Sequence, residues 1–240
     1  MTDLSFECTG VRADRYAAAP TLLFRLRITA AEGARVHAVA LRCQLRIEPA
    51  RRGYHPDEAE ALSDLFGARS RWGSTLQPLQ LAQVSLVVPG FTGETELDLP
   101  VPCSYDLEVA AGRYFRALRD GEVPLLLLFS GTVFAGSGGF HVEPVPWNKE
   151  ASVRMPVDVW QEMTEAHFPG CGWLRLPRET LDALLAYRSR HALPSWQTAV
   201  ESLLATAEDT EPPAPRARLF PKTAAARTAA VHPAIERTAP

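Results

Sequence analysis

The first 155 residues alternate between apolar and polar positions with a period of two. In the stretch TLLFRLRITA every second residue is apolar from Leu22 to Ile28, and arginines fall between them. The stretch VHAVALRCQLRI repeats the pattern from Val39 to Ile47. This period is that of a strand with one buried face. Because Gly33 separates the two stretches, we expect them to form a β-hairpin.

Six further segments have the pattern of strands: LSFECTGV, LAQVSLVVPG, ETELDLPV, SYDLEVA, VPLLLLFSGTVF and the pair FHVEPV…EASVRMPV. The run at Val123–Phe129 has no polar face, which favours a central strand covered on both sides. Turn residues separate about eight strands in all. We therefore predict a mainly β protein whose residues 1–155 form a β-sandwich.

Helical periodicity appears in two insertions and then dominates the C-terminal part. HPDEAEALSDLFG should end at Gly67, and AGRYFRALRDG should end at Gly121. After Pro156 three short amphipathic helices follow, two of them beginning near Pro177 and Pro194. Their apolar stripes are Val159–Met163, Leu181–Leu184–Leu185, and Trp196–Val200–Leu203–Leu204. Helices this short need a partner, so we expect residues 156–207 to form an extension packed on the sandwich.

The remaining residues, 208–240, are rich in Pro, Ala, Thr and charge and have no periodic apolar face. We expect a disordered tail there. The 240 residues include 28 acidic and 25 basic side chains, for a net charge of −3, so no bulk attraction to nucleic acid is expected.

The N-terminus lacks the pattern of a secretory signal, and the longest apolar run is too short to span a bilayer. We therefore predict a cytoplasmic protein without a membrane span. In that compartment thiols stay reduced. The cysteines concerned are Cys8, Cys43, Cys103 and Cys171.

The stretch HFPGCGWLRL places His167 four residues before Cys171, which suggests a metal or redox site. A zinc site needs three or four protein ligands, and the sequence contains no CxxC or HxxxH to supply them. Pro169 and Gly170 suit a helix stop, so we interpret the stretch as a turn. Ser130 and Ser137 are not part of a GxSxG motif. We predict no catalytic residues, no metal and no cofactor.

Two features are candidate recognition surfaces. One is a row of arginines that forms either a solvated sheet face or a patch for an anionic partner; its members are Arg25, Arg27, Arg42 and Arg46, continuing into Arg51, Arg52 and Tyr54. The segment ARSRWGSTLQPLQL contains Arg69, Arg71 and Trp72, and Trp147 lies in PVPWNKE. Tryptophan with neighbouring arginine suits a protein interface, while tryptophan alone also suits a buried edge of the sandwich. We take Arg69, Arg71, Trp72 and Trp147 as candidate partner-binding residues.

Two long runs carry a family resemblance. They are LVVPGFTGETELDLPVPCSYDLEVAAGRYFRALRDGEVPLLLLFSGTVF and VPWNKEASVRMPVDVWQEMTEAHFPGCGWLRLPRETLDALLAYRSRHALPSWQTAVESLL. Both resemble an actinobacterial family of uncharacterised proteins whose genes lie in clusters for high-affinity uptake NiFe hydrogenases. The resemblance extends from about Leu4 to Leu204 and excludes the tail.

The resemblance implies a non-enzymatic accessory protein that acts through protein–protein contacts in hydrogenase assembly or maturation, with a hydrogenase subunit or maturation factor as its partner. A third interpretation is an enzyme, which would need polar groups distant in sequence to converge in one cleft. The main alternative is a sandwich that binds a small ligand or a glycan. Such a protein needs a concavity lined by several aromatic side chains. The candidates for that lining are Trp72, Tyr105, Trp147 and Trp173.

Overall fold

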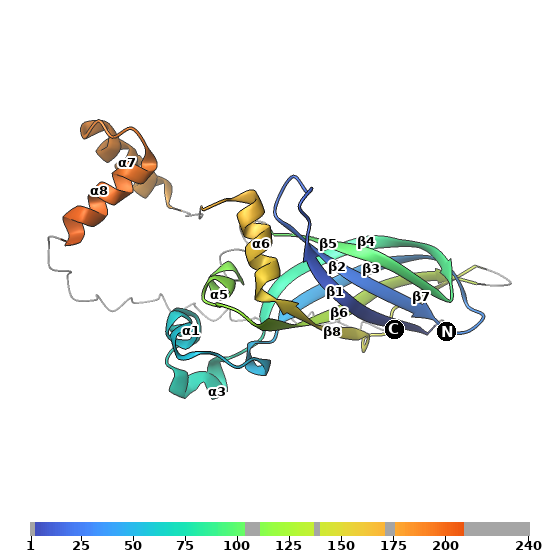
Figure 1. The fold of residues 1–240 in the computed structure, drawn as a ribbon. Helices are drawn as coiled ribbons and strands as arrows, with labels where there is room; N and C mark the ends of the chain where they lie inside the picture. The colour runs from blue at the N-terminus through green and yellow to red at the C-terminus, as the bar shows by residue number, and fades with distance from the viewer. Residues whose placement is uncertain (1–2, 104–110, 137–139, 171–175, 209–240) are drawn as a thin grey trace, which may run out of the picture. The chain divides into compact units, whose positions relative to one another are not determined.

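Eight strands in two antiparallel sheets form the main body of the protein (Figure 1). The computed structural model describes residues 3–103, 111–136, 140–170 and 176–208. The mainly β architecture predicted from the alternation is thereby confirmed, together with short helices in the C-terminal part. The strand expected in SYDLEVA and nearly all of the tail expected over residues 208–240 lie outside the described residues.

The smaller sheet has three strands in the order β1-β2-β5. Their bounds are β1 Leu4–Ala13, β2 Thr21–Ala30 and β5 Glu94–Pro102. The apolar positions of β2 that define the period of two, from Leu22 to Ile28, are fully buried. The arginines between them lie on the outer face, as the alternation predicts.

The larger sheet has the order β4-β3-β6-β7, and β8 also pairs with β6. Its strands are β3 Arg35–Ile47, β4 Leu79–Thr92, β6 Glu122–Ala135, β7 His141–Pro144 and β8 Glu150–Pro156. The all-apolar run lies in β6, which is a central strand as predicted. Leu125 and Leu127 are buried, whereas Leu126 and Leu128 are half-buried, so the outer face of this strand is only partly covered.

The hairpin expected around Gly33 is wrong. β2 pairs with β1 and β5, whereas β3 pairs with β4 and β6, so the chain crosses from one sheet to the other between Ala30 and Arg35. Gly33 has a φ of 76° in this connection. Alternation identifies the buried face of a strand and leaves its neighbours undetermined. A tight turn of this length therefore fits a crossing between sheets as well as a hairpin.

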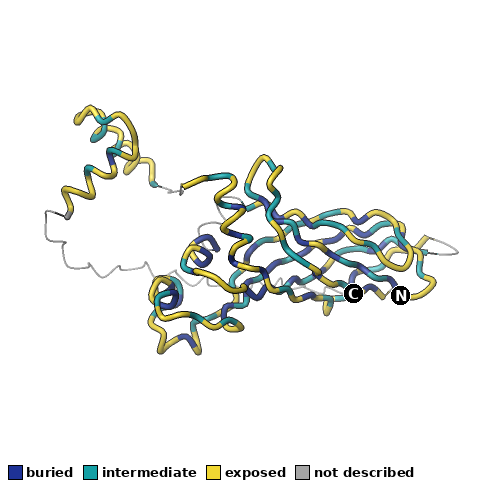
Figure 2. The backbone as a smooth tube through the Cα atoms, in the orientation of Figure 1, coloured by how far each residue is buried: buried dark blue, intermediate teal, exposed yellow. Residues whose placement is uncertain are grey.

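The two sheets face each other across a shared apolar core. Phe6 of β1 stacks on Phe129 of β6 with the ring centroids 4.4 Å apart. Cys8 and Cys43 are buried in the same core. Figure 2 shows the resulting alternation of buried and exposed positions along the strands.

Short helices gather at one end of the strands (Figure 1). They are η1 Pro49–Arg51, α1 Pro56–Ala61, α2 Ser63–Phe66, η2 Arg69–Arg71, α3 Trp72–Thr75 and α5 Arg113–Arg116. Gly67, with a φ of 72°, ends α2 as the sequence predicts. Ring contacts join Tyr54, Phe66, Trp72 and Tyr114 into one aromatic cluster. This cluster gives the helical end a core of its own.

Helix α6, Val157–His167, packs against β1, β2 and β8. Trp160 and Met163 are its buried residues on that side, and Trp160 stacks on Phe115 at 4.2 Å between ring centroids. At its C-terminal end both ring nitrogens of His167 lie near carbonyl oxygens, Nδ1 at 3.0 Å from Met163 and Nε2 at 3.1 Å from Ala17. The histidine thus ties α6 to the β1–β2 connection.

The chain divides into two compact units, residues 1–172 and 173–240. The helices expected over residues 156–207 are therefore shared between them. α6 belongs to the first unit, and α7 Arg178–Arg190 and α8 Trp196–Glu208 belong to the second. Packing of α7 and α8 on the sandwich stays a prediction. None of the helices in the described part of the chain has the length and apolar character that a membrane crossing requires.

Candidate protein-binding face

Two rows of uncharged side chains cross the outer face of the five-stranded sheet. In the first row Ala38 is paired with Pro89 on one side and with Phe134 on the other, and Phe134 is paired with Val142. The second row is formed in the same way by Val87, Ala40, Thr132 and Pro144. The eight residues of the two rows, together with His37 and Phe140, are called the outer patch below.

A β-bulge extends the outer patch at the start of β3. The ladder between β3 and β6 skips a residue between Val36 and Ala38. Val36 and Val39 are both buried, so the two residues between them lie toward the outer face. The ring of His37 there stacks on Phe140 at 6.1 Å between centroids, and Phe140 stacks on Phe134 at 6.0 Å.

The bulge depends on a glycine in the neighbouring strand. A Cβ atom at Gly90 would lie 2.8 Å from the carbonyl oxygen of His37 and 3.2 Å from that of Val36. Real Cβ atoms do not approach backbone this closely, so any larger residue at this position would push β4 away from β3. Gly90 therefore permits the close approach of the two strands that supports His37.

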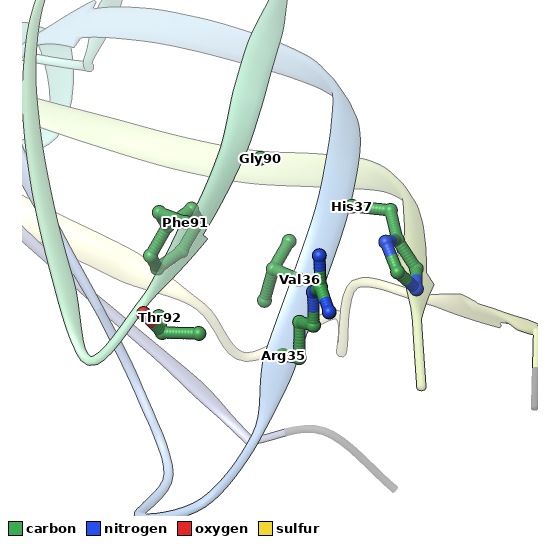
Figure 3. Close-up of a pocket in the computed structure, with 6 residues that line it drawn as sticks. All are labelled: Arg35, Val36, His37, Gly90, Phe91 and Thr92. Atoms are coloured by element: carbon green, nitrogen blue, oxygen red, sulfur yellow. The ribbon is translucent and has the colours of Figure 1, made fainter. Parts of the chain in front are cut away.

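An open depression of about 510 Å³ borders the outer patch (Figure 3). It is lined by Arg35, Val36, His37, Gly90, Phe91 and Thr92. Figure 3 shows Val36 and His37 extending from opposite sides of β3, as the bulge requires. No ion pair is found for Arg35 within the described residues. The positive charge of Arg35 therefore lies at the edge of the otherwise uncharged outer patch.

Solvent reaches the outer patch freely. The exposed fractions are 70% for Val87, 68% for Phe140 and 55% for Val142. Monomeric proteins rarely present large contiguous apolar patches, and such patches often mark contact with another molecule. Beyond the patch the next pair on the same face of the sheet is Arg42 with Ser85, so the apolar character ends there.

The outer face of the three-stranded sheet has the opposite character. Arg12, Arg25 and Arg27 form ion pairs there with acidic residues of β1 and β5, namely Glu7, Glu94, Glu96 and Asp98. The shortest of these are the Arg12–Asp98 and Arg27–Glu96 pairs, each at 2.8 Å. The arginines suggested as one surface are therefore divided between two sheets. Arg25 and Arg27 are neutralised by their own neighbours, which favours the interpretation as a solvated face.

The structure separates the candidate residues that the sequence suggested. Trp72 is only 8% exposed, and its Nε1 donates a hydrogen bond to the Gly67 carbonyl at 3.0 Å. It therefore occupies a core position, the second of the two roles considered for it. Arg69 and Arg71 are exposed on η2.

Trp147 is the candidate with an open side chain, at 93% exposure. It lies in the turn after β7, where the Lys149 amide donates to the Pro146 carbonyl at 3.2 Å. It thus follows Pro144, the last residue of the outer patch, by three positions. Of the four aromatic residues named as candidates for lining a ligand concavity, Trp72 is buried and Trp147 is exposed, while Tyr105 and Trp173 lie outside the described residues.

Sequence reasoning missed the outer patch because its rows exist only across four strands. One signal was present in β3, whose outward positions change from small apolar residues, Ala38 and Ala40, to polar ones from Arg42 onward. Without the pairing of β3 with β4 and β6, that change could not be joined to Val87 or Phe134. The β-bulge at His37 was equally invisible.

The thiols are held in their protonated form. Burial raises the pKa of Cys8 from 9.0 to about 11, and that of Cys43 and Cys103 to about 12. Such groups are poor nucleophiles at neutral pH. Cys171 lies outside the described residues. Within the described ranges no three His, Cys, Asp or Glu side chains are grouped so as to hold a metal ion.

Comparison with known proteins places the chain in one family and gives little beyond it. The profile of a family of unknown function, DUF6084, matches residues 1–212. No curated protein matches the chain.

Solved structures share only a distant likeness. A late embryogenesis abundant (LEA) protein is 12% identical over 66% of this chain and 75% of its own, with a TM-score of 0.30. A β-glucosidase from Kluyveromyces marxianus is 7% identical over 65% of this chain and 15% of its own, with a TM-score of 0.24. β-Glucosidase 3B from Thermotoga neapolitana is 11% identical over 64% of this chain and 17% of its own, with a TM-score of 0.23.

Proposed function

We propose that this chain, which belongs to the DUF6084 family, is a non-enzymatic accessory protein that binds another protein through the outer patch. Its role would be the assembly or maturation of a NiFe hydrogenase in the cytoplasm. The outer patch is the observation that supports protein binding. The proposal that the partner belongs to hydrogenase assembly rests on the resemblance of the two long sequence runs to an actinobacterial family.

The outer patch suits protein binding because removing its side chains from water costs little free energy. Its two rows contain no charged side chain, and Thr132 is their only hydroxyl-bearing residue. Burying apolar surface contributes roughly 25 cal/mol per Å². The central part of an interface is likewise depleted of charge and enriched in aromatic residues. Phe134 and Phe140 supply the aromatic part here.

The surroundings of the patch favour a macromolecular partner. The rows cross four strands of a sheet, a broad face that suits contact with another folded protein more than enclosure of a small molecule. At the rim Arg35 is free to meet a carboxylate of the partner. Trp147 continues the surface after β7, and tryptophan is among the side chains that contribute most to interfaces.

The test is complementation of a gene-deletion strain, with hydrogenase activity and large-subunit processing as readouts. Deletion should lower both, and the unaltered gene should restore them. Val87→Arg should fail to restore them, because it places a charge within the patch at its most exposed aliphatic side chain. Gln83→Arg is the matched control, since Gln83 lies on the same strand and face but outside the patch.

Both variant proteins should melt within a few degrees of the parent, because both positions are exposed. Normal activity and processing in the deletion strain would remove the hydrogenase role. A deletion phenotype that Val87→Arg corrects as well as the unaltered gene would instead remove the outer patch as the docking surface.

A further inference from the structure

Strand β4 ends the larger sheet and has one free edge. It pairs with β3 alone, and within the described parts of the chain no other backbone hydrogen bond reaches residues 79–89. A free edge presents a row of unpaired N–H and C=O groups that pair readily with another strand. Proteins protect such edges with charged side chains, prolines or bulges.

The middle of β4 lacks this protection. None of its 14 residues is charged, whereas every other strand in the described ranges carries at least one charged side chain. The edge strand β5 of the smaller sheet alternates Glu94, Glu96 and Asp98 and continues into Pro100 and Pro102. Two copies of β5 could not pair without placing carboxylates opposite each other. Two copies of β4 meet no such repulsion.

Hydrogen bonds in the neighbouring strands show which residues of β4 face the free edge. The amide of Phe129 in β6 donates to the carbonyl of Lys149, away from β3, at 2.9 Å. In an antiparallel sheet each residue directs both backbone groups to one side, and successive residues alternate. Cys43, opposite Phe129, therefore directs its groups to β4, where it lies opposite Val84. Val84 thus bonds to β3, and the residues on either side of it face the free edge.

The free backbone groups are arranged symmetrically about Ser85. By the alternation, Gln83, Ser85 and Val87 each offer one N–H and one C=O to the free edge. The regular pattern stops on one side at Leu81, the extra residue of a β-bulge, which has no opposite residue on β3. It stops on the other side at Pro89, which has no N–H. Leu81 and Pro89 are equally far from Ser85 in sequence.

We propose that β4 pairs antiparallel with β4 of a second copy of this chain, about a two-fold axis at Ser85. Ser85 then exchanges two hydrogen bonds with Ser85 of the second copy, and Gln83 exchanges two with Val87. This register satisfies every free group between the bulge and the proline. A shift by two residues in either direction would bring Pro89 or Leu81 into the ladder and leave groups unpaired. The two copies form one continuous sheet with five strands from each.

The same register covers an open margin of the core. Val84 and Leu86 point inward but are only half-buried, since β3 covers them on one side only. Across the axis Val84 lies opposite Leu86 of the second copy, so both are removed from water. A second copy fits this edge because one register satisfies both edges and opposes no like charges. The inference goes beyond the proposed function and does not depend on it.

Sedimentation equilibrium of the full chain over a range of concentrations tests the pairing. The parent should sediment at twice the chain mass. Ser85→Pro should raise the dissociation constant at least about 30-fold, because the central pair loses two hydrogen bonds. The folded monomer tolerates this proline, since the Ser85 N–H does not bond to β3. Ser85→Thr is the matched control, which keeps the N–H and should leave the dimer intact.

Charge at the axis tests the symmetry. Ser85→Glu and Ser85→Lys should each be monomeric, because like charges would lie opposite each other, and an equimolar mixture of the two should form a mixed dimer. A parent that is monomeric at every concentration overturns the proposal, and so does a dimer that withstands Ser85→Pro. A mixture that stays monomeric overturns the axis at Ser85. Circular dichroism shows that each variant remains folded.

Amide hydrogen exchange tests the register. The amides of Gln83 and Val87 should be protected in the parent dimer and exchange rapidly in the Ser85→Glu monomer. Those of Val84 and Leu86 bond to β3 and should be protected in both proteins. Equal exchange of the Gln83 and Val87 amides in the dimer and the monomer would overturn the pairing through this edge.

Discussion

Arg52 and Glu58 form an ion pair that solvent scarcely reaches: Nη2 lies 3.1 Å from Oε1, and the side chains are 7% and 0% exposed. The Glu58 carboxylate also accepts hydrogen bonds from the backbone amides of His55 at 3.0 Å and Arg119 at 2.9 Å. One carboxylate therefore joins α1 to the segment before it and to the connection that leads into β6. Its negative charge is satisfied on three sides.

Removing that charge should destabilise the first unit strongly. Glu58→Gln leaves Arg52 buried without a counter-charge, and breaking a buried pair in this way costs about 3–5 kcal/mol. The free energy of unfolding in urea measures the loss. Asp98→Asn is the control, because the pairs it breaks with Arg12 and Arg25 reach solvent and each contributes less than about 1 kcal/mol. Equal losses in the two variants would contradict the structural role given to Glu58.

The two tryptophans nominated by the sequence should respond in opposite ways. Trp72→Ala empties a site surrounded by Tyr54 and Phe66 and should cost about 3–5 kcal/mol. Trp147→Ala removes a side chain that contacts mostly water and should change stability by less than about 0.5 kcal/mol. Thermal melting of both variants distinguishes the two environments, and similar shifts would contradict the burial of Trp72.

A glycine in the centre of the larger sheet should tolerate no side chain. Gly131 has a φ of 139°, and a Cβ atom there would lie 2.0 Å from the Ala40 carbonyl oxygen. Gly131→Ala therefore forces β6 away from β3 and should cost at least about 3 kcal/mol. Gly53→Ala is the comparison, since nothing lies within 4 Å of that position. Denaturant titration of both proteins provides the measurement.

Stability should decrease in alkaline solution because of the buried thiols. Folding raises the pKa of Cys43 from 9.0 to about 12, so above pH 9 the unfolded chain releases a proton that the folded chain retains. The unfolding free energy should then fall by about 1.4 kcal/mol per pH unit for each such thiol until the folded pKa is reached. Cys43→Ala should reduce the slope between pH 9 and 11. An unchanged slope would show that the thiol does not titrate on unfolding.

The sequence predicts the strands well because burial of one face imposes a period of two, as from Leu22 to Ile28 and from Val39 to Ile47. It predicts the end of α2 at Gly67 because only glycine adopts that φ without cost. Strand partners carry no such local signature, and the expected hairpin at Gly33 fails for this reason. The outer patch could not be predicted for the same reason, because its rows depend on which strands are neighbours. The candidate residues chosen from the sequence therefore lie outside it; they are Arg69, Arg71, Trp72 and Trp147.

The crossing at Gly33 also governs the order in which the protein can fold. β3 has β4 and β6 as its neighbours, and Cys43 is paired with Phe129, which lies far along the chain. Closing such long loops carries an entropic cost and slows folding. During synthesis one edge of β3 must wait, with its backbone hydrogen-bonding groups unpaired, until β6 has left the ribosome. The nascent chain should therefore be most prone to aggregation while only its N-terminal half has been synthesised. A chaperone would be most needed at that point.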